Sequence, residues 1–408
     1  MLWQSLGETG LAAENTKKAY ELRQGLSERE KLYIETNYNL YFTGNLENAR
    51  QFCDIWAQTY PRDFLPSGTL TYIYAQLGQR DKALAKAREV LRLEPASGLA
   101  YSNLVQSYLS LGRLQEARAT VEEAQAKNLD SSGLHFHLYM IAFLENDTVG
   151  MEQQVAWGAG KPGVEATLLA IQAATAAYSG RLSKARELRR RAMALAETAG
   201  DKEAEASQEI SAALSESLFG NVVEARRLVA TASGPSKGRD VQYSAAFVLA
   251  LGGDTIRARA LTVDLGRQSQ KLTLNQFNYL QTLKAQLALN AHDSARAVEA
   301  LRAIAPYELG EVGFGSLYQV FVRGQAYLTA NKGSEAAAEF QKILDHRGIV
   351  RNEPIGALAH LQLGRAYAMQ GDIAKAKTAY QDFLALWKDA DPGIPILKQA
   401  KAEHAKLK

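Results

Sequence analysis

The sequence holds one cysteine, Cys53, and nine prolines among 408 residues. A lone cysteine excludes an internal disulfide and cannot build a structural zinc site by itself. The scarcity of proline suits a chain made mostly of helices, because proline interrupts a helix interior. No apolar run approaches the roughly 18–20 residues that cross a bilayer. We therefore expect no membrane insertion by this chain.

Positively and negatively charged residues are nearly equal in number, with a formal net charge of +3. This balance argues against nucleic acid or an anionic membrane as the main partner. Residues 1–18 lack a basic leader followed by an apolar block, so they do not resemble a secretory signal. Together with the lack of disulfides, this favours a cytoplasmic location, or an extracytoplasmic one if a membrane segment precedes Met1.

One pattern recurs along the chain: an apolar helix end, a turn residue, and a small residue five places after the turn. The turn residues Gly44, Gly78, Gly112, Asn146 and Gly180 follow one another at intervals of 34 residues. Later copies at Gly220, Gly253, His292, Asn331 and Gly371 are spaced by 33 to 40 residues. A period of 34 built on two helices is typical of the tetratricopeptide repeat. The sequence predicts an all-α fold, a right-handed α-α superhelix (solenoid) of about ten helix pairs.

Small and aromatic residues stand at fixed offsets from each turn. Where two antiparallel helices cross closely, only Gly or Ala leaves room for the partner backbone, and an aromatic ring fills the gap one turn away. Gly or Asn at the turn also tolerates the left-handed conformation that ends a helix. The predicted packing residues are Gly44, Ala49, Tyr74, Gly78, Ala83, Tyr108, Gly112, Ala117, Gly180, Ala185, Gly364, Tyr367, Gly371 and Ala376.

The repeat spacing divides the chain into three regions. Residues 1–197 hold regular repeats, the first of them truncated because only six residues precede Gly7. A chain cut from a longer protein, or a misplaced start codon, would produce such a start. Residues 198–390 hold similar repeats with longer connections, and residues 391–408 are expected to form a capping helix. In such a solenoid each unit is expected to contact only its neighbours.

Several segments carry a more specific resemblance, among them GKPGVEATLLA, AAAEFQKILDHRGIV and the ending ALWKDADPGIPILKQAKAEHAKLK. They resemble the tetratricopeptide region that follows the catalytic domain in bacterial, and especially acidobacterial, eukaryotic-like serine/threonine protein kinases. The resemblance covers nearly the whole chain and departs from the family pattern around residues 266–276. It implies regulation or partner binding rather than catalysis, with a kinase domain upstream of this chain.

Motifs for phosphoryl transfer are missing from the chain itself. A kinase needs an HRD-type catalytic loop and a metal-binding DFG, but Gly348 stands where HRG at 346–348 would need Asp. The GAGKPG segment at 158–163 superficially resembles a phosphate loop, yet Lys161 precedes Pro162 rather than Ser or Thr. A loop between two helices is the better interpretation.

The remaining reactive side chains do not form a site in the sequence. His135 and His137 lie two places apart on an expected helix, point in different directions and cannot chelate one ion. His346, His360 and His404 are similarly isolated. Cys53 lies among apolar helix residues and is interpreted as a small buried hydrophobe. We expect no catalytic residue, no metal and no cofactor.

What remains is a binding surface. In tetratricopeptide solenoids the first helix of each unit lines the concave side, and residues six places before the turn face that groove. Aromatic and amide side chains spaced one repeat apart suit an extended peptide, because rings supply contact area and amides satisfy backbone groups. Some of these rings could instead pack between units. The candidate groove residues are Glu35, Tyr38, Phe42, Tyr72, Gln76, Asn103, Gln106, His137, Met140 and Tyr178.

The sequence therefore predicts a non-catalytic scaffold that binds a peptide or protein of unknown identity in its groove. The alternative is the sensory or regulatory arm of a bacterial serine/threonine kinase, acting in signal transduction. An adaptor for the carboxylate terminus of heat-shock chaperones is disfavoured, because the inward positions carry Tyr, Gln and Met instead of the Lys, Asn and Arg clamp. An enzymatic role has no motif behind it.

Overall fold

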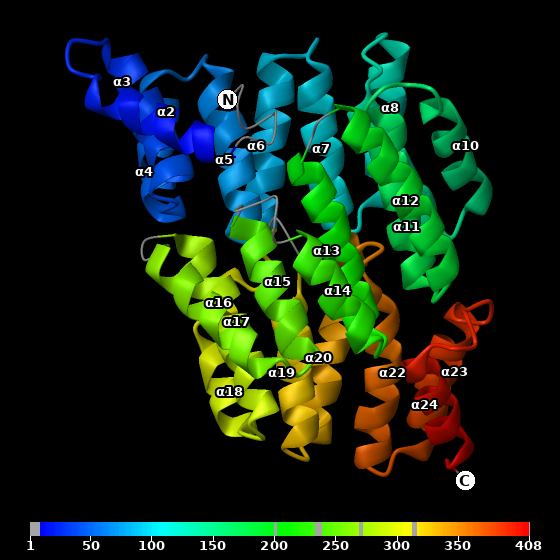
Figure 1. Cartoon of the computed structure of the whole chain (residues 1–408). Helices are drawn as coiled ribbons and strands as arrows, with labels where there is room; N and C mark the ends of the chain where they lie inside the picture. Colours follow the sequence, from blue (N-terminus) through cyan, green and yellow to red (C-terminus); the bar gives the residue numbers. More distant parts are fainter. Residues whose placement is uncertain (1–8, 200–201, 233–238, 269–271, 312–315, 408) are drawn as a thin grey trace. The chain divides into compact units, whose positions relative to one another are not determined.

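A computed structural model describes residues 9–199, 202–232, 239–268, 272–311 and 316–407. Within these ranges every regular element is helical and none is a strand. The chain forms two compact units, drawn as helices in Figure 1. Unit 1 comprises residues 1–141, 268–278 and 306–312, and unit 2 comprises residues 142–267, 279–305 and 313–408. The partial helix expected before Gly7 lies outside the described residues.

The helices of unit 1 come mainly from the first third of the chain. They are α2 (Thr9–Glu21), α3 (Glu28–Asn37), the π-helix η1 (Tyr38–Phe42), α4 (Leu46–Thr59), α5 (Phe64–Gln76), α6 (Arg80–Leu93), α7 (Gly98–Ser110) and α8 (Leu114–Ala126). The division between the units falls inside α9 (Ser132–Glu145), η2 (Asn275–Tyr279) and η3 (Ala305–Tyr307).

Unit 2 holds most of the remaining helices. The earlier ones are α10 (Thr148–Gly158), α11 (Val164–Tyr178), α12 (Leu182–Ala199), α13 (Lys202–Leu218), α14 (Val222–Ala232), α15 (Arg239–Leu251) and α16 (Thr255–Gln268). The later ones are α17 (Leu280–Asn290), α18 (Ser294–Arg302), α19 (Tyr318–Thr329), α20 (Gly333–Asp345), α21 (Arg347–Val350), α22 (Pro354–Met369), α23 (Ile373–Leu386) and α24 (Pro395–Ala405).

Successive helices pack in pairs around short turns, as α5 packs on α6 and α22 on α23. All ten turn residues of the sequence pattern have a positive φ, including the weak copies His292 and Asn331, at 58° and 57°. The alanines five places after the turns at Gly44, Gly112 and Gly180 have no exposed surface. The prediction of an all-α fold of about ten helix pairs is confirmed.

The core of unit 1 is centred on α4 and α5. Trp56 and Cys53 of α4 are fully buried with Ile73 of α5. The Trp56 indole Nε1–H donates to Asp63 Oδ2 at 3.0 Å, and the same carboxylate accepts from the Leu65 N–H that begins α5. One acidic side chain therefore caps a helix and satisfies a buried donor at once.

Close helix approach in unit 2 depends on glycine at one position that the sequence singles out. A Cβ at Gly364 of α22 would lie 2.6 Å from the Tyr380 ring of α23. Real Cβ atoms do not approach so closely, so only glycine fits without movement of the ring. Tyr74, Tyr108 and Ala376 of the predicted packing set are buried, whereas Tyr367 is half-buried beneath Lys375.

The segment predicted as a cap contains α24. Its Leu397 and Ala400 are buried, as an inward apolar stripe requires. On its other side Glu403 accepts two hydrogen bonds from the Arg365 guanidinium at 2.9 and 3.0 Å and one from the Tyr380 hydroxyl at 2.8 Å. These hydrogen bonds join α24 to both helices of the preceding pair, α22 and α23.

The expectation that each repeat contacts only its neighbours is wrong in both units. In unit 1 the Thr273 N–H donates to the Gly44 carbonyl at 3.0 Å. In unit 2 the Asp391 N–H donates to the Gly180 carbonyl at 3.0 Å. Segments about 200 residues further along the chain thus cover turns of earlier repeats. A nearest-neighbour description of stacking cannot include these contacts.

Candidate functional site

The first three predicted groove residues lie at the end of α3 and on η1. The Tyr38 ring stacks on Tyr20 of α2 with centroids 3.8 Å apart, and on Phe42 with centroids 5.1 Å apart. Glu35 forms an ion pair with Arg23 at 2.8 Å. These side chains pack mainly against the preceding helix and its connection, the alternative that the sequence left open.

A second group lies on α5 and α7 and is more accessible. The Tyr72 ring is 43% exposed, and its hydroxyl accepts a hydrogen bond from the Gln76 side chain at 2.6 Å. Asn103 and Gln106 lie on α7 and are half-buried. We call the surface formed by Tyr72, Gln76, Asn103 and Gln106 the α5–α7 face.

A later part of unit 1, residues 307–311, lies against one end of this face. The Glu311 N–H donates to the Ala75 carbonyl at 3.0 Å, and the Gln106 amide donates to Glu311 Oε1 at 2.9 Å. The buried Arg80 guanidinium donates to the same carboxylate at 3.2 Å and to the Leu309 carbonyl. The α5–α7 face therefore binds a short stretch of backbone with an acidic side chain.

Glycine makes this approach possible. A Cβ at Gly310 would collide with the Gln76 carbonyl oxygen, and a Cβ at Gly78 would lie 3.1 Å from the Gly310 nitrogen. Two glycines thus let the segment and the turn meet backbone to backbone. On its other side the Tyr307 ring contacts Phe277, with centroids 5.2 Å apart.

The last predicted groove residues do not lie on an open surface. Met140 and Tyr178 are each only 8% exposed, which corrects the expectation that they face a groove. Tyr178 packs edge-on against Phe143, and its carbonyl accepts a hydrogen bond from the Trp387 indole at 2.9 Å. Segments distant in sequence bury it, so its repeat position alone could not reveal this. His137 is half-buried and meets the Ser102 hydroxyl at 3.1 Å.

The reactive residues considered from sequence are held in structural contacts. Burial raises the pKa of the Cys53 thiol to about 12 and so favours the unreactive protonated form. His135 meets Asp130 at 3.0 Å, whereas His137 meets the Ser102 hydroxyl at 3.1 Å. The Lys161 ammonium lies 3.2 Å from the centre of the Trp157 ring.

The described parts of the chain contain no group of three His, Cys, Asp or Glu side chains placed to hold a metal ion. They also contain no helix that is long and apolar enough to span a membrane.

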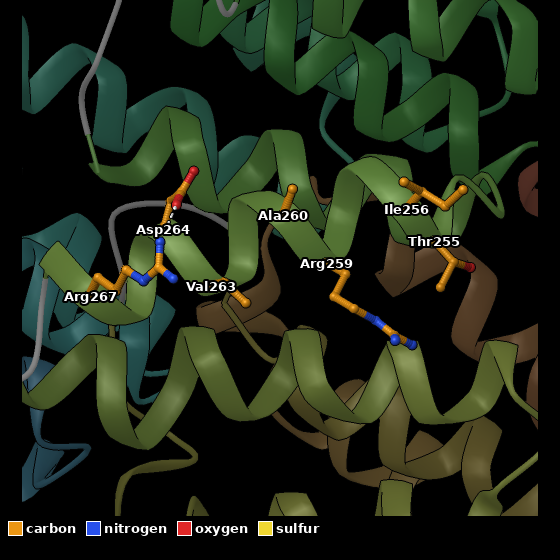
Figure 2. A pocket seen from close by; sticks show the side chains of 7 residues that line it. All are labelled: Thr255, Ile256, Arg259, Ala260, Val263, Asp264 and Arg267. Atoms are coloured by element: carbon orange, nitrogen blue, oxygen red, sulfur yellow. Dashed lines mark ion pairs between the residues drawn. The ribbon is translucent and has the colours of Figure 1, made fainter.

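A shallow hollow of about 640 Å³ lies along α16 in unit 2 (Figure 2). One helix supplies all seven lining side chains, and Ile256 at one end is 86% exposed. An ion pair between Asp264 and Arg267, with 3.7 Å between the charged atoms, lies at the other end. Because a single helix lines this hollow, it would enclose little of any ligand. We assign it no function.

Sequence reasoning missed Arg80 and Glu311, the charged pair on the α5–α7 face. Arg80 begins α6 two places after the turn residue Gly78, a position that is apolar in five of the other nine repeats, as at Leu46 and Leu182. Its burial comes from residues 307–311, more than 220 positions away. No local signal in the sequence could have paired the two.

Comparison with known proteins agrees with the helix-pair architecture. Two parts of the chain match tetratricopeptide repeat models. The matches cover residues 74–135 and 321–393, about a third of the chain. No curated protein matches the chain. The matches contain the turns at Gly78, Gly112, Asn331 and Gly371, where the sequence pattern and the positive φ values coincide.

Solved structures of similar helical arrangement share little sequence with this chain. Yeast Tom70 is 10% identical, with a TM-score of 0.38 and coverage of 93% of this chain and 95% of that one. The P58(IPK) TPR domain is 14% identical, with a TM-score of 0.25 and coverage of 93% and 98%. The human IFIT1 dimer with PPP-AAAA is 14% identical, with a TM-score of 0.42 and coverage of 95% and 81%. Sequence identities and TM-scores this low support no argument about the partners of this chain.

Proposed function

We propose that this chain is a non-catalytic protein-interaction scaffold whose α5–α7 face binds an extended, acidic peptide of a partner protein. Proteins built from tetratricopeptide repeats act as interaction scaffolds, and two parts of this chain match such repeats. The observation that carries the proposal is the binding of residues 309–311 of the same chain to that face.

The chemistry of that contact defines the peptide class. The Ala75 carbonyl accepts a backbone N–H of the segment. The Arg80 guanidinium donates to a carbonyl and to a carboxylate of the segment, and the Gln106 amide donates to the same carboxylate. Backbone contacts supply affinity without sequence preference, whereas the charge-assisted contact selects an acidic side chain. Tyr72, which is 43% exposed beside this site, offers apolar contact area for a peptide extending along the face.

A direct test uses the chain's own segment as the probe. A labelled peptide of residues 304–311 (IAPYELGE) competes with the internal copy, whose effective concentration is about millimolar. In the Glu311→Lys variant repulsion from Arg80 releases the internal copy. We expect this variant to bind the peptide at least about tenfold more tightly than the wild-type chain by fluorescence anisotropy. Adding Gln106→Ala to that variant should weaken the binding again.

Partner capture from cells of the source organism extends this test. Tyr72→Ala plus Gln106→Ala should reduce recovery of specific partners. The control Glu122→Ala plus Gln125→Ala changes exposed residues of α8 and should leave recovery unchanged. No peptide binding in the released variant, or equal partner recovery by both double variants, would contradict the proposal. The kinase-arm alternative has no further observation in its favour and stays a prediction from sequence resemblance.

A further inference from the structure

Unit 2 also contains a cavity that the proposed scaffold function does not use. A cavity of about 320 Å³ lies among α11, α12, α13 and the connection before α22. Much of its lining is alanine, with a few polar groups that include Arg189, Ser211 and Ser215. A cavity of this size that combines apolar walls with several polar groups can hold a small molecule.

Arg189 is the unusual member of this lining. The residue is 8% exposed, yet its guanidinium makes no hydrogen bond or ion pair with any residue in the described ranges. Burial lowers the pKa of Arg189 to about 10, so the side chain still carries its charge at neutral pH. Five donors of a charged group therefore lie at a cavity wall without an acceptor from the chain.

The nearest acidic partner is already engaged by another arginine. Glu216, fully buried, accepts from Arg186 at 2.7 and 2.9 Å through both carboxylate oxygens, and from the Asn221 amide at 2.9 Å. Glu216 attracts Arg189 through the electric field but forms no hydrogen bond with it. Because no residue in the described ranges accepts from Arg189, its donors are left for solvent or for a ligand in the cavity.

We propose that the Arg189 cavity binds a small oxyanion, a molecule carrying a carboxylate or phosphate group. The planar guanidinium fits either group through two parallel hydrogen bonds. The Ser211 and Ser215 hydroxyls now donate to carbonyls of their own helix at 2.8 and 3.2 Å, and they can rotate toward a ligand.

The lining also holds one acidic group, Glu353. Glu353 accepts a hydrogen bond from the Tyr318 hydroxyl at 2.9 Å, and burial raises the pKa of its carboxyl group. This cavity belongs to unit 2, whereas the α5–α7 face belongs to unit 1, so the two proposals stand independently.

The test measures binding of inorganic phosphate and of succinate to the full chain by calorimetry and thermal unfolding at constant ionic strength. Succinamide serves as the uncharged probe. We expect one saturable oxyanion site per chain, and the tighter of the two probes identifies the preferred group. Arg189→Met should weaken that binding at least about tenfold. The matched control Arg190→Met removes the same charge from the next residue, which is exposed, and should bind like the wild-type chain.

The same variant gives a second readout that does not depend on the choice of ligand. Because Arg189 is buried without acceptors, Arg189→Met should unfold at a higher temperature than the wild-type chain when no oxyanion is present. Added oxyanion should reverse the order by stabilising the wild-type chain alone. The proposal is overturned if neither probe saturates a site in the wild-type chain, or if Arg189→Met binds the probes as tightly as the wild type.

Discussion

The two units cover the turns of their early repeats in different ways. In unit 1 the turn at Gly78 meets residues 307–311 through backbone hydrogen bonds and the Arg80–Glu311 ion pair. In unit 2 the turn at Gly180 meets Trp387, whose indole is 2% exposed and packs edge-on against Phe219. The contact at Gly78 is polar and involves a connection between helices, whereas the contact at Gly180 involves a buried ring of the core.

This difference indicates which contact can open. A buried indole contributes several kcal/mol through apolar area and packing, whereas a partly exposed ion pair contributes about 1 kcal/mol. Residues 307–311 can therefore leave the α5–α7 face at small cost, while release of Trp387 disrupts the interior of unit 2. Under the proposed function we expect peptide exchange in unit 1, whereas Trp387 stabilises the interior of unit 2. Four predictions, from the largest effect to the smallest, test this contrast.

Trp387→Ala should lower the free energy of unfolding by about 3–5 kcal/mol, because it removes a buried ring and leaves the Tyr178 carbonyl without its indole donor. Urea denaturation followed by circular dichroism measures the change. Lys388→Ala, at the exposed neighbouring residue, should stay within about 0.5 kcal/mol of the wild type. Equal effects of the two changes would remove the distinction between the units.

The same substitution at two helical glycines should change stability in opposite directions. Gly364→Ala in unit 2 should destabilise by about 1–3 kcal/mol, since its Cβ meets the Tyr380 ring. Gly68→Ala in α5 of unit 1 should stabilise by about 0.5–1 kcal/mol, because the nearest atom lies 4.0 Å from the added Cβ and alanine favours helix. Chemical denaturation of both variants measures the difference. A gain in stability at Gly364 would show that the two helices separate easily.

Glu311→Ala should cost only about 1 kcal/mol of global stability, because the lost ion pair is partly exposed. Its larger effect should be local, with faster cleavage of residues 305–311 in limited proteolysis. Glu299→Ala breaks an exposed pair with Arg302 in α18 and serves as the control. Unchanged cleavage in Glu311→Ala would mean that the ion pair does not hold the segment.

The smallest effect concerns pH and His360 in unit 2. Burial lowers the pKa of His360, with a smaller lowering by Arg347 and an opposing effect of Asp382. Because the unfolded chain takes up the proton first, stability is present above the ordinary histidine pKa of about 6.5 and is lost as pH falls through the folded pKa. His360→Gln should flatten this decline in urea titrations between about pH 7 and pH 5. An unchanged slope would contradict the assignment.

Much of the architecture could be predicted from local pattern. The offset between a turn residue and the small residue five places later identified turns as weak as His292 and Asn331, and both have left-handed φ. The prediction succeeds because close helix crossing and a helix-ending turn each restrict residue type at one position. Tyr72 and Gln106 lie on one face because each stands six places before the turn residue of its repeat.

The candidate site could be predicted only in part. Tyr178 holds a groove-like position in its repeat, yet Trp387 and Phe143 bury it. Arg80 stands where five of the other nine repeats carry an apolar residue, but only residues 307–311 show what covers it. Arg189 lines a cavity whose wall includes residues 352–354, more than 160 positions further along the chain. The boundary between residues 197 and 198, drawn from the spacing of the repeats, stays a prediction. The compact units are instead divided within α9, and residues 268–278 and 306–312 join unit 1.

The amino-acid sequence by itself determined the helix pairs, their turns and the small residues at their crossings, because each depends on residues fewer than 40 positions apart. Only the tertiary structure decided which side chains stay accessible, since that depends on whether a segment some 200 residues later covers them. Local periodicity places a residue on a helix face, but it does not indicate which distant segment of the chain packs against that face.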